Sequence, residues 1–240
     1  MRLFCALLLI ACAASAQAAI QTREMPYRSA DGTRMVGYFA YDDSKPGIRP
    51  GVIVVHEWWG LNDYAKRRAR DLAELGYSAL AIDMYGEGKH TEHPQDAMAF
   101  MQAATRDADA AKARFLAGLE LLKRQPQTDP SQIAAIGYCF GGKIVLDMAR
   151  QGLPLAGVAS FHGALGTATP ASKGSVKAKI LVEHGSADSL VPAKDLEHGF
   201  TNPDADAHKG HGLDIGYDRQ ADQRSWADLQ AFLKDIFGQG

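Results

Sequence analysis

One short stretch near the middle of the chain limits the possible folds more than any other. It reads Ile133-Ala134-Ala135-Ile136-Gly137-Tyr138-Cys139-Phe140-Gly141-Gly142. An apolar run followed by Gly-x-Cys-x-Gly is typical of a nucleophile elbow, in which a reactive side chain stands at the tip of a strand-to-helix turn. The backbone of such a turn is strained, and side chains at Gly137 and Gly141 would collide there. We therefore predict that Cys139 is a nucleophile at a strand-helix junction.

The helix expected after Cys139 supports this interpretation. Its first backbone amides point toward the turn, and the helix dipole favours a thiolate over a neutral thiol. The alternative is that Cys139 is a small core residue, because a single cysteine in an apolar segment usually is one. The position between a strand-like run and the helix-like run Lys143–Arg150 favours the nucleophile.

The composition indicates one α/β domain. The chain has 240 residues, of which 46% are hydrophobic and 22% charged, with a formal net charge of -2. A chain of this size and composition can bury a sizeable core. The near-neutral charge gives no reason to expect nucleic acid or an anionic membrane surface as a partner. After the N-terminal segment, no stretch is apolar for long enough to span a bilayer.

Residues 1–19 have the parts of an export signal. Arg2 supplies a positive charge, Leu3–Ala14 is a short apolar stretch, and small residues follow as a cleavage site. We expect this segment to be removed, residues 20–240 to form a single domain, and the mature protein to be periplasmic or secreted. Cys12 also fits a lipoprotein site, where it would become the lipidated first residue. With simple cleavage Cys139 is the remaining cysteine, which excludes an internal disulfide.

Strand-like and helix-like segments alternate along the rest of the chain. Strands are expected at Thr22–Arg28, Met35–Tyr41, Gly51–Val55, Tyr77–Ile82, Ile133–Ile136, Leu155–Phe161 and Lys179–Glu183. Helices are expected at Asp63–Leu75, Pro94–Ala104, Asp107–Arg124, Lys143–Arg150 and Asp218–Phe237. Such alternation predicts a mostly parallel sheet with helices on both faces, in which loops at the carboxyl ends of the strands build the active site.

The loop after Gly51–Val55 is the first of these carboxyl-end loops. It reads His56-Glu57-Trp58-Trp59-Gly60, at the position from which an elbow enzyme takes a second oxyanion-hole amide. Our hypothesis is that the backbone N–H groups of Phe140 and Trp58 hold a developing oxyanion. Glu57 would then lie near the sulfur, and a tryptophan would wall the pocket. The alternatives are a solvated loop acid and ordinary core tryptophans.

The loop after Lys179–Glu183 offers an acid. The chain order nucleophile, acid, base predicts that Asp188 orients an imidazole and stabilises its cationic form. The alternative for Asp188 is an Asx turn after a strand. The base should follow later in the chain, and His198 is the best candidate.

The other histidines are given different roles. Three stand where strands end, where structural roles are common: His56, His162 and His184. His208, His211 and Asp214 lie in a loop without the spacing of metal ligands, so we expect neither a metal nor another cofactor.

Taken together, these motifs resemble the dienelactone hydrolase family of α/β-hydrolases. The matching stretches are Val55-His56-Glu57-Trp58-Trp59-Gly60, Asp83-Met84-Tyr85-Gly86, Ile136-Gly137-Tyr138-Cys139-Phe140-Gly141-Gly142, His184-Gly185 with Asp188, and His198-Gly199-Phe200-Thr201-Asn202-Pro203. The likeness covers most of the chain, from about Tyr27 to Phe237.

The resemblance implies an α/β-hydrolase fold and a triad of Cys139, His198 and Asp188. Such a triad hydrolyses a small ester or lactone through an acyl-enzyme intermediate, without a cofactor. The family also implies that the acid at Glu57 contacts the resting thiol and helps to form the thiolate. The substrate pocket would include Trp59, Tyr85 and Asn202.

Two features depart from the family pattern. Dienelactone hydrolases bind the substrate carboxylate partly through an arginine four residues after the catalytic histidine, and here that residue is Asn202, so dienelactone itself is not expected as the substrate. His198 follows Asp188 by only 10 residues. A parallel crossover needs at least about 10–12 residues before its strand is counted. We therefore expect the last helix and strand to be missing, with an unpaired sheet edge and His198 on a short loop.

Three functions stay open on the sequence alone. The first is hydrolysis of a small ester or lactone by Cys139 and His198. The second is a binding domain that has lost catalysis, as the short Asp188–His198 interval suggests, and the third is acyl transfer to an acceptor other than water. A His198 ring within hydrogen-bond reach of the Cys139 sulfur would favour the first over the second.

Overall fold

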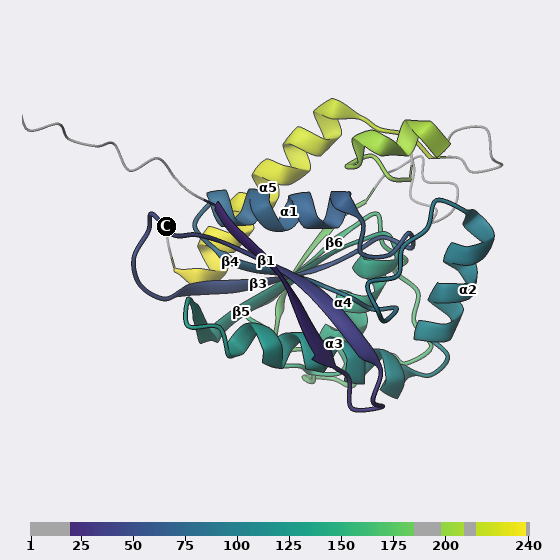
Figure 1. Ribbon diagram of the computed structural model, residues 1–240, viewed down its shortest axis with the longest axis horizontal. Coiled ribbons are helices and arrows are strands. Elements are labelled where there is room, and N and C mark those ends of the chain that lie inside the picture. The colour runs from purple at the N-terminus through teal and green to yellow at the C-terminus, as the bar shows by residue number, and fades with distance from the viewer. Residues whose placement is uncertain (1–19, 185–197, 209–214, 239–240) are drawn as a thin grey trace, which may run out of the picture.

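Among the residues that the structure describes, seven strands form a twisted sheet at the centre of the protein (Figure 1). The structure is a computed structural model that describes residues 20–184, 198–208 and 215–238. The strands are β1 (Ile20–Arg28), β2 (Arg34–Asp42), β3 (Arg49–Val55), β4 (Ser78–Ile82), β5 (Thr128–Tyr138), β6 (Gly157–Phe161) and β7 (Lys179–Glu183). Their order across the sheet is β1-β2-β4-β3-β5-β6-β7. Every predicted strand is confirmed.

The sheet is antiparallel at one side and parallel through the rest. β1 and β2 form a hairpin, and β2 pairs antiparallel with β4. From β4 through β3, β5 and β6 to β7 each pair is parallel, with Val55 opposite Gly137 and Tyr138 opposite Phe161. The carboxyl ends of β3, β5, β6 and β7 therefore meet at one edge, where the sequence places its candidate site residues.

Helices cover both faces of this sheet (Figure 1). They are α1 (Asp63–Glu74), α2 (Pro94–Ala104), α3 (Ala108–Lys123), α4 (Phe140–Arg150), α5 (Arg219–Phe237) and a short 3₁₀ helix η1 (Pro203–His208). α1 and α5 pack on one face, whereas α3 and α4 pack on the other. In the described part of the chain no helix is long and apolar enough to cross a membrane.

Local signals explain why the helices begin and end where they do. The Asn62 side chain accepts a hydrogen bond from the backbone N–H of Ala65 and so caps α1, and Asp218 caps α5 by accepting from two amides of its first turn. Leu229 and Leu233 of α5 are fully buried, as its apolar face predicts. The predicted bounds of α1 and α5 differ from the observed ones by one residue at most, whereas α4 begins three residues before its predicted start at Lys143.

β7 is the edge strand of the sheet among the described residues. Its Leu181 packs with the core that α5 covers. Ile180 and Val182 point to the other face and are 47% and 41% exposed. An exposed edge here agrees with the expected loss of a last crossover. Residues 185–197, between β7 and His198, lie outside the described residues.

Candidate active site

The turn that carries Cys139 has the geometry of a nucleophile elbow. Cys139 has φ 53° and ψ −115°, a conformation that a side-chain-bearing residue adopts only when its surroundings impose it. A Cβ on Gly137 would lie 2.1 Å from the Gly141 carbonyl oxygen, and one on Gly141 would lie 2.2 Å from that of Val55. Both glycines are therefore required by the close approach of backbone to backbone, as the sequence predicts.

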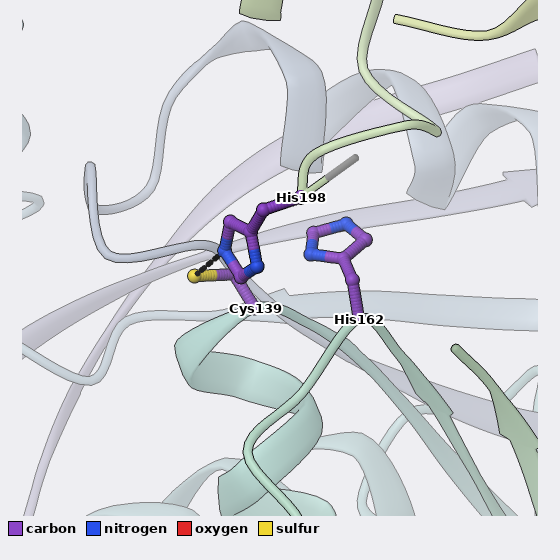
Figure 2. A group of neighbouring side chains, drawn as sticks. All are labelled: Cys139, His162 and His198. Atoms are coloured by element: carbon purple, nitrogen blue, oxygen red, sulfur yellow. Dashed lines mark hydrogen bonds between the residues drawn. The ribbon is translucent and has the colours of Figure 1, made fainter. Parts of the chain in front are cut away.

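The structure brings His198 to this thiol. Its Nε2 atom lies 3.0 Å from the Cys139 Sγ atom, a contact that Figure 2 shows as a dashed line. The short interval after Asp188 thus does not keep the imidazole from the sulfur. Asp188, the predicted acid of the triad, lies outside the described residues.

Backbone contacts with the segment before α5 hold the His198 loop from one side. The His198 carbonyl accepts a hydrogen bond of 3.0 Å from the Gly216 N–H, and the Phe200 carbonyl accepts one of 3.1 Å from the Asp218 N–H. The position of His198 is therefore tied to the segment just before α5.

A buried arginine holds the same loop from α1. Arg68 donates a 2.9 Å hydrogen bond to the Thr201 carbonyl and forms an ion pair with Asp222 of α5. The Tyr64 hydroxyl lies 2.7 Å from the Thr201 side-chain oxygen. The guanidinium also lies over the ring of Trp226 at 5.0 Å. These contacts join α1, α5 and the His198 loop, so they position the imidazole indirectly.

Glu57 is a buried acid in the wall of the site. Its side chain lines the same cavity as Cys139 and accepts a 2.8 Å hydrogen bond from the Asn202 amide. Burial raises the pKa of Glu57 to about 7, against the opposing effects of Asn202 and His198. Asn202 stands where the family pattern has an arginine, and its side-chain N–H group is already engaged by Glu57.

Two backbone amides are the predicted candidates for an oxyanion hole. α4 begins at Phe140, so the Phe140 N–H belongs to the first turn and has no partner within the helix. The Trp58 peptide is fixed by the Tyr85 hydroxyl, which donates a 2.9 Å hydrogen bond to the Trp58 carbonyl. Phe140, Trp58 and Cys139 all border one cavity.

This cavity has a volume of about 390 Å³ and a largely apolar wall. It is lined by Glu57, Trp58, Trp59, Met98, Met101, Cys139, Phe140, Lys143, Ala164, His198, Gly199, Asn202, Ala205 and Ile215. The predicted pocket residues Trp59 and Asn202 are among them. Tyr85 is not: its side chain is buried behind Trp58, so it supports the wall without lining it.

His162 is the site residue that sequence reasoning missed. It follows β6, it is fully buried, and its ring meets that of His198 edge to face at 4.9 Å (Figure 2). Burial and the neighbouring His198 and His184 lower the pKa of His162 well below its usual value. The signal was available, because β6 pairs with β5 and their carboxyl ends must lie together. The second strand-end histidine, His56, has the expected structural role, since its Nε2 accepts from the Met84 N–H.

The mostly parallel sheet and the strained strand-to-helix turn at Cys139 are those of an α/β-hydrolase fold. Comparison with known proteins gives the family: the profile of the dienelactone hydrolase family matches residues 35–198. The chain belongs to the dienelactone hydrolase family.

Two solved structures share the fold over most of the chain. A dienelactone hydrolase-like promiscuous phosphotriesterase from metagenomic libraries is 36% identical, with a TM-score of 0.81 over 91% of this chain and 99% of the other. A structure described as m3DLH is 33% identical, with a TM-score of 0.82 over 91% and 99% of the two chains. Protein usf of Aquifex pyrophilus is 36% identical over 125 residues, which are 50% of this chain and 52% of that protein. The match to this curated relative therefore spans about half of its length.

The raised pKa of Glu57 predicts a pH dependence of stability. Between the ordinary value of 4.5 and about 7 the folded protein holds a proton that the unfolded chain has lost. The free energy of unfolding should therefore fall as pH rises through this range, by an amount on the order of 3 kcal/mol. Glu57→Gln keeps the acceptor for Asn202 and removes the titration. Urea unfolding at the two ends of the range should show the wild type losing stability relative to this variant, and parallel pH profiles would contradict the assignment.

The Arg68 contacts predict that substitution of Arg68 destabilises the protein more than substitution of the neighbouring Arg67. Arg68→Met removes the buried charge that pairs with Asp222 and the shorter of the two hydrogen bonds to the Thr201 carbonyl, which should lower the free energy of unfolding by about 3–5 kcal/mol. Arg67→Met, at a half-exposed site on the same helix, should cost about 1 kcal/mol or less. Chemical denaturation of both variants is the measurement. Equal losses would show that Arg68 does not hold the loop.

Proposed function

We propose that this protein hydrolyses a small ester or lactone, with Cys139 as the nucleophile and His198 as the general base. The observation that carries the proposal is the 3.0 Å separation between His198 Nε2 and Cys139 Sγ. A nucleophile within hydrogen-bond reach of a base is the arrangement that covalent catalysis requires. The same contact favours an enzyme over a binding domain that has lost its catalytic geometry.

The first half of the reaction forms an acyl-enzyme. His198 takes the thiol proton as the Cys139 sulfur attacks the carbonyl carbon, and the carbonyl π electrons move to the oxygen. The Phe140 and Trp58 amides stabilise the resulting oxyanion, a contribution that is typically worth about 2.7–4 kcal/mol for each donor. The oxyanion then collapses and expels the alkoxide, which takes the proton from His198. A thioester on Cys139 remains.

The second half releases the acid. His198 removes a proton from water as the water oxygen attacks the thioester carbonyl. The tetrahedral intermediate then expels the Cys139 thiolate, which takes the proton back from His198. A carboxylate next to the imidazole would hold its tautomer and stabilise its cationic form. We assign this role to Asp188 from its place in the sequence.

The cavity supports an uncharged, largely apolar substrate. Trp58, Met98 and Met101 give it an apolar wall. The amide of Asn202 is used by Glu57. The amine of Lys143 is held in an ion pair by Asp147 one turn further along α4. Since both polar side chains already have protein partners, a substrate carboxylate finds no dedicated anchor among these lining residues. We therefore propose short uncharged esters or lactones rather than dienelactone.

A phosphotriester is a second candidate substrate class. The observation that favours it is the 36% identity, over nearly the whole of both chains, to a protein described as a promiscuous phosphotriesterase. The same nucleophile and oxyanion-hole amides would act on phosphorus, with loss of an aryloxide in place of an alkoxide.

We also propose that the chain is exported, on the basis of the N-terminal sequence alone. Intact-mass and N-terminal peptide analysis of the protein recovered from the periplasm of an expressing bacterium tests this. A mature chain that begins near residue 20 agrees with simple cleavage, and one that begins with lipidated Cys12 agrees with a lipoprotein. A full-length chain confined to the cytoplasm would contradict export.

Substitution of the proposed nucleophile and base tests the hydrolase directly. Cys139→Ala should reduce hydrolysis of p-nitrophenyl acetate to the uncatalysed rate, and Cys139→Ser should leave a weak esterase because a hydroxyl is harder to deprotonate than a thiol. His198→Gln should lower kcat/KM by about 10²–10⁴-fold. The control is His90→Gln, which changes an exposed histidine outside the cavity. An aryl phosphotriester assayed in parallel tests the second substrate class.

Full esterase activity in Cys139→Ala would refute the nucleophile. Wild-type activity in His198→Gln would refute the base. A wild-type protein that hydrolyses neither substrate class would favour the binding domain.

A further inference from the structure

One sulfur and two imidazole nitrogens, all atoms that can bind a metal ion, lie close together in the proposed active site. One atom each from Cys139, His162 and His198 lies within 4.8 Å of the other two. Figure 2 shows the three side chains gathered at the point where β5 and β6 end. The proposed catalytic cycle uses Cys139 and His198 but gives His162 no role.

His162 has an unused nitrogen at this place. Its Nε2 atom lies 3.2 Å from the Thr201 hydroxyl oxygen. Its Nδ1 atom is buried and has no hydrogen-bond partner among the residues that the structure describes. Figure 2 shows a ring nitrogen of His162 on the side that faces His198 and Cys139. When the proton of the ring is on Nε2, the lone pair of Nδ1 points toward the cluster. Because buried polar atoms normally have a partner, an unpartnered Nδ1 at this place indicates a site for a ligand.

One thiolate and two imidazoles are a donor set that suits zinc. Zinc–sulfur bonds of about 2.3 Å and zinc–nitrogen bonds of about 2.0–2.1 Å place tetrahedral ligand atoms roughly 3.3–3.8 Å apart. No pair of the present atoms is more than 4.8 Å apart, so the longest distance has to shorten by about 1 Å, whereas the 3.0 Å Cys139–His198 contact has to lengthen by about 0.5 Å. Three protein ligands leave the fourth position open toward the cavity.

The surroundings of His162 match those of a metal-bound histidine. A ligating imidazole usually donates its other N–H to an acceptor that fixes the ring. Here Thr201 provides that acceptor, and a carboxylate oxygen of Glu57 lies 3.9 Å from the same Nε2 atom. The ring is thus held by the protein on the side away from the cluster.

We propose that Cys139, His162 and His198 bind one zinc ion, and that zinc reversibly inhibits the enzyme by occupying the nucleophile and the base together. Binding replaces the proton shared by the Cys139 sulfur and the His198 imidazole, and this proton passes to solvent. The metal site rests on the placement of the three side chains. The inhibition rests in addition on the proposed hydrolase function.

Cobalt(II) is the probe that tests the site, because its spectrum reports both ligand type and geometry. Metal-stripped full-length protein titrated with Co²⁺ should bind one equivalent. The complex should show a thiolate-to-cobalt charge-transfer band and the intense visible bands of a tetrahedral ion. Cys139→Ser should lose the charge-transfer band. His162→Gln should bind Co²⁺ at least about 10-fold more weakly, whereas His90→Gln should bind it as the wild type does.

Zn²⁺ should displace the cobalt and suppress p-nitrophenyl acetate hydrolysis over the same concentration range. A chelator should restore the activity. A wild-type protein that hydrolyses the ester but gives no charge-transfer band would overturn the zinc site and leave the hydrolase standing. One that gives the cobalt spectrum without hydrolysis would support the zinc site and refute the proposed function. Equal Co²⁺ affinities for wild type and for folded His162→Gln, checked by circular dichroism, would also overturn the site.

Discussion

The rest of this structure depends on the strained turn at Cys139. The turn is possible because Gly137 and Gly141 let β5, α4 and the end of β3 approach so closely that a Cβ at either glycine would lie about 2 Å from a carbonyl oxygen. This close packing puts the sulfur at the carboxyl edge of the sheet, beside the first amide of α4 and the loop that carries Glu57 and Trp58. The placement of the proposed nucleophile and of the proposed oxyanion-hole amides therefore follows from one backbone constraint.

The position of His198 depends on different contacts. In the described part of the chain, no strand beyond β7 delivers this histidine to the site, and its loop is instead held by the start of α5 and by Arg68 and Tyr64. These contacts explain how an imidazole can stand 3.0 Å from the thiol although it follows Asp188 so closely in sequence. Glu57 and Asn202 form a second buried pair at the same loop. Asn202 stands where the family pattern has an arginine, and its side-chain amide donates a hydrogen bond to the Glu57 carboxylate.

Much of this architecture could be predicted from the sequence because the relevant signals are local. Short apolar runs predicted the strands, and the two glycines predicted the elbow. Contacts between distant segments could not be predicted in this way. The hydrogen bond between Asn202 and Glu57 spans 145 residues, and the role of Tyr85 behind the cavity wall depends on how Trp58 is turned. His162 was assigned a structural role from its strand-end position, and only the packing of β5 against β6 shows that it belongs to the site.

The central claim is that the Cys139 sulfur carries the acyl group during turnover. The most direct measurement is rapid acid quenching during hydrolysis of p-nitrophenyl acetate, followed by intact-mass and peptide analysis by mass spectrometry. The account predicts one acetyl group per chain, located on Cys139, together with a burst of p-nitrophenol that approaches one equivalent when deacylation limits the rate. Turnover with the acetyl group on another residue would contradict it.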